Sequence, residues 1–130
     1  MAEAEITTEP YTRKPRIAYF SMEIALQSDI PTYSGGLGVL AGDSLRAAAD
    51  IGVPIVAVTL VFRGGHFRQE IDAQGRQIEL ADEWEPERYA TRLHATIALE
   101  IEGRHVWVGG WLYRLSTRLD SGVPVLLLDT

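Results

Sequence analysis

The residues best suited to do chemistry lie in the stretch YSGGLG, residues 33–38, which has three glycines in four positions. Glycine has no Cβ, so backbone N–H groups in such a stretch can approach a ligand closely. A helical pattern follows, and the free amides and positive dipole end of a helix favour a phosphate or another negative charge. The alternative is that the glycines only form a sharp entry to the helix, and the stretch alone does not decide between the two.

The surrounding residues argue against two common glycine-rich motifs. Gly36, Gly38 and Ala41 satisfy the dinucleotide pattern G-x-G-x-x-G/A. However, no acidic residue lies about twenty positions further on to bind a ribose, because that region is the apolar stretch around Val58 to Val61. The stretch also lacks the G-K-[ST] sequence of a Walker-type phosphate loop.

The elements around the glycines predict a βαβ unit. Residues 16–22, RIAYFSM, form a short apolar run typical of a buried strand, and residues 54–62 are nearly all apolar, as in a strand covered on both faces. Between them, residues 39–51 carry apolar side chains at helical spacing, with Gly52 as a left-handed cap and Pro54 as a stop. Strand, glycine turn, helix and strand together predict an α/β fold with a parallel sheet.

The second half of the chain predicts antiparallel hairpins. The runs HFRQEID and RQIELAD flank AQG, whose glycine suits a hairpin turn. Alternating apolar and polar residues on both sides of Glu102-Gly103 predict another hairpin. Residues 123–129, VPVLLLD, read as a further buried strand, and such a strand should be followed by a loop and a helix. We therefore expect residues 16–130 to be a partial domain behind a polar leader, residues 1–15, with exposed apolar surface on Val123 to Leu128.

Composition excludes several classes of function. The 130 residues carry a net charge of −6, which argues against a nucleic-acid surface. The absence of cysteine excludes disulfides and thiolate metal sites, and the three histidines are too far apart for a zinc site. No apolar stretch reaches membrane-spanning length and no signal peptide is recognisable, so a cytoplasmic protein without membrane contact is expected.

Four segments, in this order and at short spacings, resemble the N-terminal region of α-glucan phosphorylases, the family of glycogen, starch and maltodextrin phosphorylases: IAYFSMEIAL, YSGGLGVLAGDSLRAAADIGVP, GHFRQEIDAQGRQIELADEWEP and PVLLLDT. Together they cover nearly the whole chain. The resemblance implies a Rossmann-like N-terminal domain of the glycosyltransferase B arrangement, incomplete here and carrying β-hairpin insertions. It implies transfer of a glucosyl unit from an α-1,4-glucan to phosphate, giving glucose 1-phosphate. The implied partners are that glucan, phosphate, a missing C-terminal domain and, in a homo-oligomer, further copies of the chain.

The resemblance also implies a cofactor and a site. Pyridoxal 5′-phosphate acts in this family through its phosphate group, as a proton relay to the substrate phosphate. Matched residue by residue, the phosphate and substrate site falls on Gly35, Gly36, Leu37, Gly38 and Glu23, with Gly36 beside the cofactor. The family's cofactor lysine belongs to the C-terminal domain, and Lys14, the chain's one lysine, matches nothing. We therefore expect no catalytic residue and no metal site in this chain, and no phosphorylase activity from the chain alone.

Two departures and two alternatives accompany the resemblance. Ala25 stands where animal-type phosphorylases carry an aromatic residue, which suggests the shorter, bacterial-type branch. Glycogen and starch synthases share the fold and a GGLG loop, but they place a lysine where Tyr33 stands here, so a synthase is the less favoured reading. The other alternative is a non-catalytic carbohydrate-binding or regulatory half-domain.

Two further features have both a functional and a structural interpretation. His66 follows a glycine pair and could reach a ligand, although a loop histidine is more commonly solvated. Trp107, Trp111 and Tyr113 alternate along one predicted strand and could form a platform for sugar stacking. Core packing is the commoner role of such aromatic residues.

Overall fold

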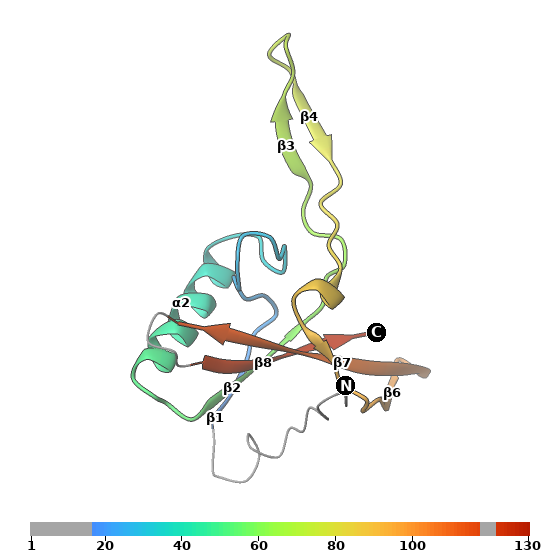
Figure 1. The fold of residues 1–130 in the computed structure, drawn as a ribbon. Coiled ribbons are helices and arrows are strands. Elements are labelled where there is room, and N and C mark those ends of the chain that lie inside the picture. The colour runs from blue at the N-terminus through green and yellow to red at the C-terminus, as the bar shows by residue number, and fades with distance from the viewer. Residues whose placement is uncertain (1–16, 118–121) are drawn as a thin grey trace, which may run out of the picture.

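The computed structural model describes residues 17–117 and 122–130, so the predicted leader lies outside the described residues. Its helices and strands are β1 Ile17–Phe20, α2 Gly36–Asp50, β2 Ile55–Leu60, β3 Arg68–Ile71, β4 Gln77–Leu80, the short 3-10 helix η1 Pro86–Arg88, β5 Thr91–Arg92, β6 Ile97–Ile101, β7 Arg104–Ser116 and β8 Gly122–Asp129 (Figure 1). The main sheet has the order β1-β2-β8-β7-β5, and β6 pairs with β7. The chain is therefore a mixed α/β fold with a partly parallel sheet.

The predicted βαβ unit is confirmed. Strands β1 and β2 are parallel, with Ile17 opposite Ile55, and α2 connects them. Strand β8 joins β2 in parallel, which puts the predicted strand 123–129 in the middle of the sheet. The predicted start of the helix is wrong: α2 begins at Gly36 and not at Val39, so two of the three glycines belong to its first turn. Glycine has low helix propensity, which is why the sequence favoured a loop there.

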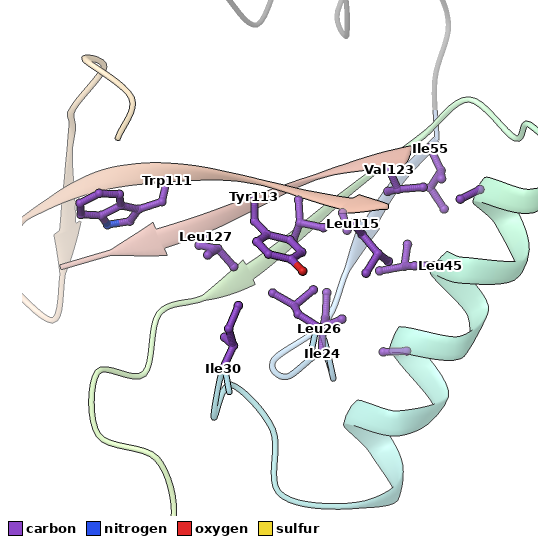
Figure 2. Packing of buried hydrophobic residues seen from close by; sticks show 14 of the residues in the cluster. Ile24, Leu26, Ile30, Leu45, Ile55, Trp111, Tyr113, Leu115, Val123 and Leu127 are labelled. Carbon is purple, nitrogen blue, oxygen red and sulfur yellow. The ribbon is translucent and has the colours of Figure 1, made fainter. Parts of the chain in front are cut away.

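One face of the sheet, which we call the helix face, packs against α2 and the segment that precedes it. Buried side chains alternate along the strands, as in Val123, Val125 and Leu127 of β8. The irregular segment between β1 and α2 adds Ile24, Leu26 and Ile30, each at most 2% exposed (Figure 2). The three alternating aromatic residues of β7 do not share one environment. Trp111 and Tyr113 lie in this core, whereas Trp107 is 66% exposed.

The opposite face of the sheet is only partly covered in the described part of the chain. Val56, Val58 and Leu60 of β2 point away from α2, and Leu60 is 41% exposed. The expectation of exposed apolar surface on Val123 to Leu128 is wrong: Val125 and Leu127 are fully buried on the helix face, and the side chains of β8 on the opposite face are partly buried. The expectation of a buried first strand is also wrong, because β1 is an edge strand that leaves Phe20 74% exposed.

The first predicted hairpin is confirmed as an arm that projects from the sheet (Figure 1). Strands β3 and β4 are antiparallel, and every residue of β3 is exposed. Asp72 fixes the turn by accepting hydrogen bonds from the amides of Gln74 and Arg76, at 2.9 and 2.8 Å. Gly75 has a φ of 79°, which a glycine adopts without steric cost.

The second predicted hairpin is also confirmed, and its turn carries strain. Glu102 and Gly103 connect β6 to β7 with φ values of 51° and 73°, as a type I′ turn requires.

Asparagine tolerates the left-handed region at position 102 better than glutamate does. We expect Glu102→Asn to raise the free energy of unfolding by about 0.5–1 kcal/mol, measured by urea denaturation. Glu100→Asn in β6 is the control and should give no gain, because asparagine is disfavoured in strands; an equal gain at both positions would contradict the strain.

No helix among the described residues is both long and apolar enough to cross a membrane.

Candidate functional site

The glycine stretch forms the beginning of α2. Gly35 is the N-cap with an extended φ of 161°, and no side chain caps the helix there. An α-helix leaves its first N–H groups without partners inside the helix, and here they belong to Gly36, Leu37 and Gly38. The first turn has no acidic residue, so no carboxylate side chain in it offsets the positive end of the helix dipole. The turn can therefore offer backbone donors to an anion.

The glycines of this turn differ in what requires them. A Cβ on Gly38 would lie 2.4 Å from the Cβ of Tyr33, so packing excludes a side chain at that position. A Cβ on Gly35 or Gly36 would meet no atom within 4 Å. Neither residue has a φ in the left-handed region that favours glycine. Within the described structure, neither backbone conformation nor packing therefore requires glycine at these two positions. The space beside their backbone is open.

The segment after β1 holds the glycine turn at both ends. The Glu23 carboxylate accepts a hydrogen bond from the Ser34 amide at 2.7 Å, just before the turn. The Ala25 amide donates to the Gly38 carbonyl at 2.9 Å, inside the turn. We call residues 23–26 the brace. The sequence placed Glu23 in the site, and the structure shows its carboxylate bonded to the protein backbone.

Helix α2 fixes the brace in turn. The Arg46 guanidinium donates to the carbonyls of Ala25 and Leu26, at 3.0 and 2.6 Å. A Cβ on Gly42 would lie 2.4 Å from the Ala25 oxygen, so this glycine permits the close approach of helix and brace. The turn, the brace and the helix therefore form one connected unit.

A cavity of about 410 Å³ lies beside this unit. Its walls include Glu23, Tyr33 and Ser34 from the first half of the chain, and Phe62 and His66 from the segment after β2. The cavity therefore stands where β1 and β2 end, the edge at which open α/β sheets bind ligands. His66 is exposed on its wall, in agreement with a solvated loop histidine and within reach of a ligand in the cavity.

The chain resembles known phosphorylases along most of its length. It is 44% identical over 132 aligned residues to a maltodextrin phosphorylase of Thermococcus litoralis, covering 95% of the chain and 15% of that protein. It is 30% identical over 127 residues to a glycogen phosphorylase of Aquifex aeolicus, covering 92% of the chain and 18% of the relative. A glycogen phosphorylase of Mycobacterium tuberculosis is 49% identical over 77 residues, which are 59% of the chain and 9% of the relative. The chain belongs with the α-glucan phosphorylases. It spans less than a fifth of the length of these three relatives, and no protein-family model matches it.

This phosphorylase segment also has a charged group at the edge of the sheet that the sequence did not single out. Asp129 ends β8, and its carboxylate accepts hydrogen bonds from Arg63 at 2.6 Å and from the Trp111 indole at 2.9 Å. Burial would raise the pKa of this carboxyl, but the hydrogen bonds and the charges of Arg63 and Arg92 outweigh burial and lower the pKa. The ion pair ties the segment that leads to His66 to the central strand. A carboxylate directly after a buried strand was the signal that could have identified it.

The described residues contain no group of three or more His, Cys, Asp or Glu side chains that could hold a metal ion.

Proposed function

We propose that the chain forms one wall of the active site of an α-1,4-glucan phosphorylase, which transfers a glucosyl unit from the glucan to phosphate and gives glucose 1-phosphate. The open space beside Gly35 and Gly36 carries this proposal, because backbone and packing leave these glycines unexplained. The phosphorylase names of the relatives support the same reaction. In this proposal residues 16–130 are part of a Rossmann-like domain of the glycosyltransferase B arrangement, in a cytoplasmic enzyme.

The proposed substrate site consists of the amides of the glycine turn. Gly36, Leu37 and Gly38 would donate hydrogen bonds to a phosphate oxygen or to a hydroxyl of the transferred glucose. Because the amides belong to a braced backbone, they are oriented before the ligand arrives, which is how such donors stabilise developing negative charge most effectively. Glucan, phosphate, a C-terminal domain outside this chain and further copies in a homo-oligomer remain the proposed partners.

Pyridoxal 5′-phosphate fits the same turn. A Cβ on Gly36 would meet no protein atom within 4 Å, and this open space supports the proposed contact between the backbone and the cofactor's phosphate group. When bound, the cofactor would supply a phosphate group that relays a proton to the substrate phosphate. Lys14 lies outside the described residues, and we propose that the cofactor's lysine is not in this chain.

An amide titration tests the phosphate site on the chain itself. We expect inorganic phosphate to shift the ¹⁵N–¹H signals of Gly36, Leu37 and Gly38 saturably, because the first N–H groups of a helix have no partner inside it. Gly75 and Gly103 lie in the two hairpin turns and are the internal controls, which should not move. Absence of a saturable shift at the glycine turn, or equal shifts at the controls, would refute the site.

A phosphorolysis assay tests the reaction. With maltodextrin, phosphate and added pyridoxal phosphate, the 130-residue chain alone is expected to release no glucose 1-phosphate, because its one lysine matches no cofactor lysine. Release of glucose 1-phosphate would contradict this part of the proposal. Binding of maltodextrin without any response to phosphate would favour the carbohydrate-binding alternative.

A further inference from the structure

We propose that Glu23 is a positioning residue, which holds the glycine turn ready for an anion by accepting the Ser34 amide and does not itself bind the substrate. The inference deepens the proposed function and rests on it for the identity of the ligand. It changes the role that the sequence gave to Glu23. Its basis is the 2.7 Å hydrogen bond between the Glu23 carboxylate and the backbone N–H of Ser34.

The brace controls the turn from two sides. Glu23 fixes Ser34, the residue directly before the N-cap, and Ala25 fixes the Gly38 carbonyl three residues beyond the N-cap. Between these points lie the residues whose amides are free to bind, Gly36 and Leu37. A glycine-rich stretch has high conformational freedom, so fixing both of its ends limits the backbone entropy that a ligand must remove on binding.

A second set of contacts prevents the brace from moving as a whole. The Thr32 hydroxyl is fully buried and donates to the Ile24 carbonyl at 2.9 Å, which ties the brace to the chain just before Ser34. Ser21 continues the connection to the sheet. Its hydroxyl donates a hydrogen bond to the Glu23 carbonyl, and its backbone amide donates to the carbonyl of Val58 in β2. These contacts fix the backbone of Glu23 relative to the sheet.

The charge of Glu23 argues against a direct role with phosphate. A carboxylate repels an anion bound at the neighbouring amides, and this repulsion weakens affinity unless another contribution offsets it. The hydrogen bond from the Ser34 amide offers that contribution, and it needs only an oxygen acceptor within reach, which a neutral amide side chain also supplies. What the turn requires from Glu23 is therefore an acceptor atom at the correct reach, and the negative charge is dispensable.

Two substitutions separate reach from charge. Glu23→Gln keeps an oxygen acceptor at the same reach and removes the charge, whereas Glu23→Asp keeps the charge and shortens the side chain by one methylene. We expect Gln to preserve the Ser34 amide shift and the heteronuclear NOE values of Ser34, Gly35 and Gly36 in the chain without phosphate. We expect Asp to lower these NOE values and to weaken phosphate binding about tenfold, the cost of losing one hydrogen bond to a charged group. Phosphate affinity of the Gln variant should equal or exceed that of the wild type.

Controls make the outcomes distinct. Asp29→Asn removes one negative charge from the same segment, at a side chain that accepts a hydrogen bond from the Ser28 hydroxyl, and should leave the turn unchanged. Thermal melting should be the same in all variants to within a few degrees. If Gln loosens the turn and Asp does not, charge and not reach matters, and the positioning role is overturned; unchanged NOE values in both also overturn it. If wild-type chain binds no phosphate, the proposed function fails, while the NOE values without ligand still decide the role of Glu23.

Discussion

Gly36→Ala is expected to weaken phosphate binding at least about tenfold, or 1.4 kcal/mol, while the free energy of unfolding stays the same or rises slightly. The new methyl group would meet no protein atom within 4 Å, so it creates no clash inside the chain. Alanine also has the higher helix propensity, by up to about 1 kcal/mol in a helix interior and less in a first turn. The methyl would instead occupy the space beside the amides. Phosphate titration followed by amide shifts, together with urea unfolding, measures both quantities.

Gly38→Ala is the matched comparison two residues further along the same helix. Its Cβ would lie 2.4 Å from the Tyr33 Cβ, and the backbone on both sides is held by hydrogen bonds. We expect a loss of about 1–3 kcal/mol of stability from this overpacking. If Gly36→Ala destabilised the chain as Gly38→Ala does, the space beside Gly36 would be structural. If Gly36→Ala bound phosphate like the wild type, the open space would have no role in binding.

The order of elements could be predicted from the sequence because each rests on local chemistry. Apolar runs identified β2 and β8, and Gly75 and Gly103 identified the two hairpin turns. The start of α2 was not predicted, because glycine propensity argues for a loop, whereas the helix begins at Gly36. The exposure of β1 could not be predicted either, because an apolar run does not reveal whether its strand lies at the edge of the sheet.

The position of the glycine turn at the start of a helix was predictable from the sequence, and the contacts that hold it were not. A glycine cluster before a helical pattern predicts a sharp turn at the start of a helix, and only the resemblance assigned a ligand to that turn. The bond from Ser34 to Glu23, eleven residues away, depends on the path of an irregular segment that no periodicity describes. The link between Arg63 and Asp129 joins residues 66 positions apart and depends on β2 and β8 being neighbours. Such contacts require the register of the folded sheet.

Leu127→Ala is expected to cause the largest loss of stability, about 3–4 kcal/mol. Leu127 is fully buried in β8, the strand between β2 and β7, and it faces Thr59 on one side and Trp111 on the other. Removing its side chain leaves a cavity in the centre of the helix face, where neighbouring strands are held on both sides and cannot close in. Urea unfolding of the chain measures the loss.

Leu128→Ala tests whether the two faces of the sheet differ as the structure shows. Leu128 is the next residue of the same strand and points to the opposite face, where it remains partly exposed in the described part of the chain. We expect a loss of about 1 kcal/mol, since less apolar area leaves water when this side chain is placed. Because both variants replace a leucine of β8 by alanine, a difference between their losses reports the burial of the side chain and not its place along the strand. Equal losses at the two leucines would mean that the opposite face is as well covered as the helix face, and that the chain packs differently from the fold described.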